Sequence, residues 1–168
     1  MQELDVVWLE MLSQAEADAS LSGRGDVAEY IRLRASNDRV RMAGTKWLIG
    51  SFIELALEPA LARASLSVDR ISPHAFRRST SNMVGEAVEI TYGMRCLTVE
   101  AGWTRTPSDG VMRHGALAAA NIRHRGIPEA GVELMLVRTP GLPEWIESAG
   151  RRITTADLRA HLDILLGH

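Results

Sequence analysis

The first third of the chain repeats apolar residues at three- and four-residue spacing. This period predicts an amphipathic helix from Leu4 to about Leu21, with one apolar stripe facing the core. The Ser22-Gly23-Arg24-Gly25 segment then predicts the end of this helix, because glycine readily adopts the left-handed conformation that terminates helices. The residues of the stripe are Trp8, Met11, Leu12, Ala15 and Ala19.

A second helix is predicted from Asp26, whose carboxylate suits the N-cap, to Met42. Gly44 either closes this helix or lies inside one longer helix. In the first case Thr45 caps a third helix. The inward side chains of that third helix would be Trp47, Leu48, Phe52, Leu55 and Ala56.

After Pro59 the helical period gives way to short alternating runs, which are typical of half-buried strands. Gly93 separates two of these runs, so they form either a hairpin or one long strand with a glycine kink. The turn-rich segment 126–131 precedes the most apolar of the predicted strands. The predicted strands contain Leu66 and Val68, Val88 to Tyr92, Cys96 to Val99, Leu117 to Ile122, and Val132 to Val137.

Three further segments between or after these runs are interpreted from their turn and capping residues. Ser72-Pro73 predicts an N-cap followed by a short helical turn through His74 and Phe76, and residues 79–82 are predicted as a loop. A short helix is expected around Trp145. The last helix is predicted to begin at Thr154 or Thr155, with Asp157 completing a capping box and a core-facing stripe of Leu158, Leu162 and Leu165.

This order of elements predicts an α+β fold: N-terminal helices packed on an antiparallel sheet of about four to five strands, followed by a C-terminal helix. No internal repeat or low-complexity segment divides the chain. We therefore expect a single domain over residues 1–168, with a helical part at 1–58, mostly strands at 65–138 and a second helical part at 143–166.

Composition adds constraints on the class of protein. The 168 residues are 46% hydrophobic and 24% charged, as in an ordinary globular protein. Cys96 is the single cysteine, so no internal disulfide can form, and strand alternation predicts a buried structural thiol. The sequence has no apolar run long enough to span a membrane and no signal-like N-terminus. A soluble, cytoplasmic protein is the expectation.

Charge is unevenly distributed along the chain. Residues 70–125 carry eight arginines and four acidic residues, whereas the segments on both sides are net acidic. Eighteen of the nineteen basic residues are arginine, a bias that we attribute to codon composition rather than to a mechanism. A local basic excess can attract anions. The whole chain is slightly acidic, however, which makes nucleic-acid binding unlikely as its function.

The segment 100–110 is the best candidate site in this basic region. Glu100 closes a strand, Gly102 allows close approach of another backbone, Trp103 offers a stacking face and Arg105 offers a fork for a carboxylate or phosphate. The competing interpretation is a wide hairpin loop in which Pro107-Ser108-Asp109-Gly110 is the turn and Trp103 covers the core of the sheet.

Two Arg-His pairs extend the candidate set. Arg113-His114 and Arg123-His124 place imidazoles beside guanidinium groups, where histidine can titrate near neutral pH and act as an acid or base. His74, with Arg77 and Arg78, adds either to an anion pocket or to a basic surface turn. The scattered histidines and one cysteine do not form a zinc pattern, and no phosphate loop or nucleophile elbow is present. The sequence thus predicts no metal and no cofactor.

These observations leave several hypotheses open. The first is a domain that binds a small anionic or carboxylate-bearing ligand between sheet and helices, with ligand-binding residues Trp103, Arg105, Arg113 and Arg123. The second is a small enzyme that uses Glu100 and His114 as its acid–base pair. The third is a structural or assembly subunit that would bury the Val132–Val137 strand against a partner. A homo-oligomer is also among the expected states. Weak nucleic-acid binding is the fourth.

Overall fold

The computed structural model describes residues 3–61 and 64–167, and the chain divides into two compact units that meet within a helix. The first unit ends at Ala43 and the second begins at Gly44. Helix α1 (Glu3–Leu21) belongs to the first unit, and α2 (Gly25–Ala56) runs through both. The prediction of a helix that ends before the Ser22–Gly25 segment is confirmed.

Gly44 lies inside α2, so the prediction of one long helix is confirmed and that of a separate third helix is wrong. Glycine occupies position 44 because the helix packs closely there, not because the helix ends there. A side chain at position 44 would bring its Cβ within 2.5 Å of a methyl carbon of Leu136. Glycine here lets the helix approach the sheet.

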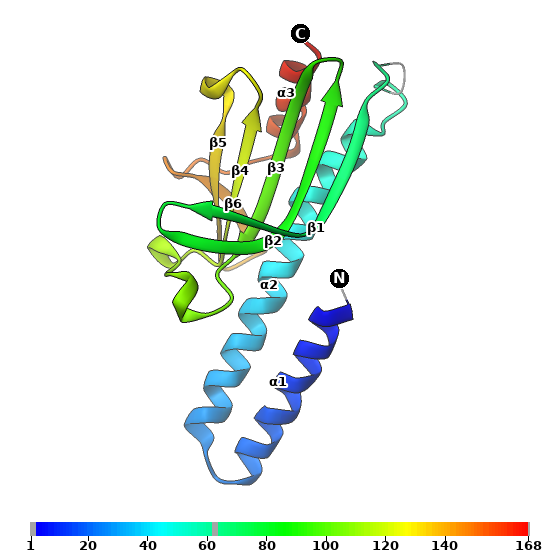
Figure 1. The fold of residues 1–168 in the computed structure, drawn as a ribbon. Coiled ribbons are helices and arrows are strands. Elements are labelled where there is room, and N and C mark those ends of the chain that lie inside the picture. Colours follow the sequence, from blue (N-terminus) through cyan, green and yellow to red (C-terminus); the bar gives the residue numbers. More distant parts are fainter. Residues whose placement is uncertain (1–2, 62–63, 168) are drawn as a thin grey trace. The chain divides into compact units, whose positions relative to one another are not determined.

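In the first unit, α1 and the first half of α2 lie side by side as an antiparallel hairpin (Figure 1). Their mutual contact buries Leu12, Ala19, Ala28 and Ala35. An ion pair of 2.8 Å between Arg32 and Glu16 adds a polar link at the surface. The predicted stripe on α1 is therefore only half correct: Trp8, Met11 and Ala15 remain exposed.

The second unit contains an antiparallel sheet in which, over the described residues, six strands follow one another in sequence order. The α+β class is confirmed, with more strands than the four to five predicted. The hairpin at Gly93, where φ is +58°, is also confirmed. The strands are β1 (Ser67–Arg78), β2 (Ser81–Tyr92), β3 (Arg95–Trp103), β4 (Ala118–His124), β5 (Val132–Val137) and β6 (Glu144–Glu147).

Two segments predicted to be helical are strands, and the predicted loop at 79–82 shrinks to a tight turn. Ser72 and Pro73 lie inside β1, at a register shift between Ile71 and His74, because an edge strand tolerates proline at a bulge. Trp145 lies in β6, paired with Leu136 of β5, and its indole N–H donates to the carbonyl of Gly44 at 2.9 Å. Pairing within the sheet and this buried hydrogen bond thus outweigh the capping and turn residues that predict helical structure in these two segments.

The second half of α2 and helix α3 (Thr155–Leu166) cover one face of the sheet. Phe52 and His161 are neighbours, with ring centroids 6.4 Å apart, and His161 contacts His124 of β4. The predicted core residues Leu158, Leu162 and Leu165 of α3 are buried, whereas Trp47 of α2 is 41% exposed, contrary to prediction. This helix-covered face carries the apolar core.

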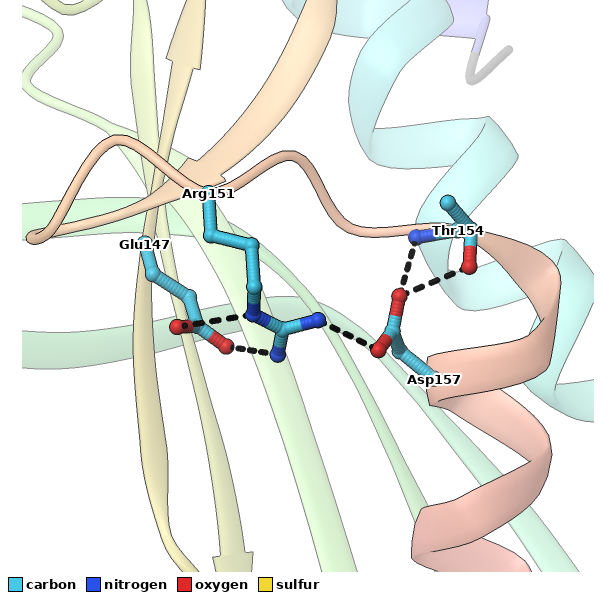
Figure 2. Close-up of polar contacts among 4 residues, drawn as sticks. All are labelled: Glu147, Arg151, Thr154 and Asp157. Atoms are coloured by element: carbon cyan, nitrogen blue, oxygen red, sulfur yellow. Dashed lines mark hydrogen bonds and ion pairs between the residues drawn. The ribbon is translucent and has the colours of Figure 1, made fainter.

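The start of α3 is fixed by a polar cluster that also joins it to β6 (Figure 2). The Asp157 carboxylate accepts hydrogen bonds from the Thr154 backbone N–H at 2.8 Å and from the Thr154 hydroxyl at 2.7 Å, which confirms the predicted capping box. Arg151 donates both to Asp157 and to Glu147 at the end of β6. These bonds hold the pKa of Asp157 below its ordinary range, the Thr154 hydroxyl being the largest cause.

Candidate functional site

The opposite face of the sheet is concave because the β1–β2 hairpin turns across it (Figure 1). Gly85 of β2 and Gly102 of β3 are register partners at the bend. A Cβ on Gly102 would lie 2.7 Å from the backbone of Val84, and one on Gly85 would lie 2.0 Å from the carbonyl oxygen of Ala101. The close backbone approach predicted at Gly102 is thus present, and it is made to β2.

Arg78, at the end of β1, holds the hairpin in this position. Its Nη1 atom donates to the carbonyl of Leu134 at 2.6 Å, and Nη2 lies 3.2 Å from the carboxylate of Glu133. Leu134 and Glu133 belong to β5, three strands away from β2 in the sheet. His74, Phe76 and Arg78 alternate as half-buried residues of β1, between exposed ones, so this side of the strand faces the hollow.

A cavity of about 340 Å³ lies on this concave face. Its apolar floor includes Met83, Ala119 and Met135, and register pairing places these residues on the sheet face opposite the helices. The cavity is therefore not between sheet and helices. The polar part of the lining combines two arginines and a histidine with one carboxylate and several hydroxyls. These polar residues include Arg78, Arg113, His114, Glu133, Ser79 and Ser81.

The rim of the cavity is held in an unusual backbone conformation. Ser79, in the β1–β2 turn, has φ of +54°, and His114, in the loop before β4, has φ of +55°. Such left-handed conformations are uncommon for residues other than glycine and concentrate at functional sites. Arg113 connects the two loops by donating from Nη2 to the Ser79 hydroxyl at 3.1 Å. Two strained positions and a basic side chain thus meet at one edge of the cavity.

A buried polar cluster lies on the same sheet face, centred on Glu100, which is 5% exposed. One of its oxygens accepts hydrogen bonds from Asn121 Nδ2 at 2.8 Å and from Arg123, and the other lies 2.9 Å from Nε2 of His74. The register pair of Glu100 and Asn121 explains this convergence. A second hollow of about 360 Å³, lined by Asn121, Arg123 and Glu133 among others, adjoins the cluster.

Trp103 and Arg105 are placed elsewhere. Trp103 follows Gly102 in β3, so its side chain is on the helix-covered face, where it is 5% exposed. The Arg105 guanidinium lies over its ring at 3.9 Å. The turn predicted after them is present as a 3-10 helix (Pro107–Asp109) that is capped by a hydrogen bond of 2.9 Å from the Thr106 N–H to Asp109.

The structure therefore brings together some of the predicted site residues and separates others. Arg113 and His114 share the cavity, and Arg123 joins Glu100 in the polar cluster. Among the cavity-lining residues that the structure describes, neither Glu100 nor Trp103 nor Arg105 is present. Ligand binding and acid–base catalysis by these side chains stay predictions.

The remaining chemical candidates lie outside the cavity. His124 is packed against α3, where burial lowers its pKa. Cys96 is a buried free thiol, as predicted. Within residues 3–61 and 64–167, no group of three or more histidine, cysteine or acidic residues could hold a metal ion. Over the same residues, no helix has the length and apolar content needed to cross a membrane.

Sequence reasoning missed the contribution of the β1–β2 turn to the site. The sequence places Arg78 in a basic segment and predicts a loop at Ser79 and Ser81, and it relates neither to the loop before β4. Because the sheet bends at Gly85 and Gly102, the β1–β2 turn lies next to the loop before β4. Comparison with known protein families, with curated proteins and with solved structures finds no match to this chain.

Proposed function

We propose that this protein binds a small anionic ligand, such as a carboxylate or phosphate compound, in the cavity on the concave face of the sheet. The observation that carries the proposal is the cavity's charge: among the described lining residues, Arg78 and Arg113 stand against one carboxylate, that of Glu133. A guanidinium group has five N–H donors arranged in a fork that matches a carboxylate or phosphate. Bidentate contacts of this kind are among the stronger hydrogen bonds in proteins.

Both arginines keep donors for such a ligand. Toward described residues, Arg78 uses its Nη1 and Nη2 atoms once each, and Arg113 uses Nη2 once, toward Ser79. The hydroxyls of Ser79 and Ser81 can add hydrogen bonds, and His114 can add a further donor. The methionine floor favours a ligand that carries an apolar part beside its charge.

Size limits the ligand class. A cavity of about 340 Å³ is at the lower end of the range for small-molecule pockets, so the expected ligand is metabolite-sized. The strained backbones at Ser79 and His114 support a preorganised rim, because strain of this kind persists only where surrounding contacts hold it.

The test is calorimetric titration of the purified protein with carboxylates, inorganic phosphate and phosphomonoesters, chosen after a thermal-shift screen of the same compounds. Replacing Arg113 by glutamine is expected to weaken binding at least about tenfold, since a charge-assisted bond is lost. Arg105→Gln is the matched control, because Arg105 lies over Trp103 and does not line the cavity.

Two outcomes would contradict the proposal. One is the absence of any shift across the whole set of anions. The other is a loss of affinity in Arg105→Gln with none in Arg113→Gln, which would move the site to the Trp103 loop.

A further inference from the structure

The helical hairpin of α1 and the first half of α2 exposes more apolar side chains than it buries. Among its described residues, the buried apolar side chains are those of Leu12, Ala19, Ala28 and Ala35. The exposed apolar residues of the hairpin are larger; they include Val7, Trp8, Met11, Val27 and Tyr30, which are between 36% and 63% exposed. In proteins, helices owe most of their stability to the packing of an apolar face rather than to helix propensity.

The exposed residues of α1 form a regular stripe. Val7, Met11 and Ala15 follow one another at four-residue spacing, with Trp8 beside them, so they share one side of the helix. This is half of the stripe that the sequence predicts to be buried. The other half, Leu12 and Ala19, packs on α2. The helix therefore has two apolar faces, and only one of them is covered within the described chain.

A matching stripe on α2 lies on the same side of the hairpin. The Trp8 indole N–H donates to Asp38 at 3.1 Å, and the Arg34 guanidinium lies 5.2 Å from the centroid of the Trp8 rings. Tyr30 precedes Arg34 by four residues, so it lies one turn along the same side of α2. Val27, which is 36% exposed, precedes Tyr30 by three residues and Arg34 by seven, so it lies on this side as well. The two stripes form one surface, which we call the hairpin face: Val7, Trp8, Met11, Ala15, Val27 and Tyr30.

We propose that the hairpin face is the interface of a homodimer, in which two copies of this chain pack their hairpins into a four-helix bundle. The area is sufficient. Helix α1 has 19 residues, hence a length of about 28 Å, and two helices side by side are about 20 Å wide. Pairing two such faces buries on the order of 1,000 Å², which reaches the size of a specific interface.

Charge favours a second copy as the partner and selects its orientation. Helix α1 carries five acidic residues and no basic one, whereas residues 24–41 carry five arginines and three acidic residues. A two-fold axis parallel to the helices places each α1 over the α2 of the other copy, so opposite charges meet. The alternative axis places α1 over α1 and brings like charges together. The hairpin is thus complementary to itself, and all neighbouring helices in the bundle are antiparallel.

The experiment is sedimentation velocity on the full chain from about 1 to about 200 µM, where a dimer shows concentration-dependent mass. Met11→Glu and Tyr30→Glu are expected to raise the dimer dissociation constant at least 100-fold, because each buries a charge in the interface. Met94→Glu is the matched control: the same change at a residue that is 96% exposed in the β2–β3 turn leaves the dimer intact.

A second measurement needs no substitution. Raising the salt concentration is expected to weaken the wild-type dimer, since screening removes attraction between acidic α1 and basic α2. A wild type that is monomeric over the whole range would overturn the proposal, as would a dimer that persists in both Met11→Glu and Tyr30→Glu. A dimer that tightens with salt would overturn the assigned orientation. Circular dichroism of each variant confirms that the helices and sheet are folded.

Discussion

The Nε2 atom of His124 on β4 lies 3.0 Å from the Nδ1 atom of His161 on α3. The rings are stacked, with centroids 5.2 Å apart, and the residues are 6% and 8% exposed. One ring donates and the other accepts, so the accepting ring must be neutral and the pair cannot be doubly protonated while this bond exists. Burial lowers the pKa of both residues, and that of His161 falls to about 4, with the nearby charge of His124 as the second cause.

This pair makes stability depend on pH. A histidine whose pKa is lower in the folded state binds protons preferentially when unfolded, so stability is full above pH 6.5 and is lost as pH falls. Between pH 7 and pH 5 we expect the free energy of unfolding to drop by about 2 kcal/mol from His161 alone. Carboxylates of ordinary pKa stay ionised over this interval. Urea unfolding at several pH values measures the drop.

A variant pair identifies the histidine responsible. His161→Phe should largely remove the loss between pH 7 and pH 5, whereas His114→Gln, at an exposed histidine, should leave it unchanged. If the drop persists in His161→Phe with its wild-type size, another group is titrating and the assignment to this pair is wrong.

Elements with an unbroken local period could be predicted from the sequence. The boundaries of α3 follow from Thr154, Asp157 and a leucine stripe, all within one segment, and β5 was predicted from Val132 to Val137, as observed. Pro73 and Trp145 were misassigned because their conformations are decided by pairing with β2 and β5. Distant partners of this kind leave no mark on local periodicity.

The candidate site shows the same limit. Arg113 and His114 were expected in the basic region, and both line the cavity. The contribution of Arg78 and Ser79 depends on the bend at Gly85 and Gly102, which turns β1 over the sheet. The presence of glycine does not by itself predict such a bend, because every glycine in the sequence is equally compatible with a turn.

Gly102→Ala should therefore be strongly destabilising. The added methyl group meets the backbone of Val84 at 2.7 Å, and a backbone cannot rotate away as a flexible side chain can. We expect a loss of about 3 kcal/mol, the upper end of the cost of overpacking. The control is Gly50→Ala in α2, where a Cβ meets no atom within 4 Å and helix propensity favours alanine. Equal denaturation midpoints for the two variants would refute the role of Gly102.

Asp157→Ala should loosen the start of α3. The substitution removes the acceptor for the Thr154 N–H and the link to Arg151, and loss of a helix cap costs about 1 kcal/mol. The pKa of Asp157 is lowered by folding, so its contribution is present at neutral pH and disappears as the carboxylate is protonated below pH of about 4.

The control for this prediction is Asp163→Ala, an exposed acidic residue near the C-terminal end of the same helix. Its removal should be neutral or slightly stabilising, because acidic residues are unfavourable there. Thermal unfolding of the three proteins at pH 7 gives the comparison. If Asp163→Ala lost as much stability as Asp157→Ala, the loss would come from removing a negative charge and not from removing the helix cap.

Glu100→Gln should cost more stability than Arg123→Gln. The Glu100 carboxylate is buried and lies within hydrogen-bond distance of Asn121, Arg123 and His74, so an amide in its place removes the negative charge that faces the Arg123 guanidinium. Breaking such a buried cluster costs about 3 kcal/mol. The Arg123 side chain is 58% exposed and can be replaced by water, so its loss should cost below about 1 kcal/mol. Urea denaturation at pH 7 measures the free energy of unfolding of both variants. Equal losses in Glu100→Gln and Arg123→Gln would contradict a buried structural role for Glu100.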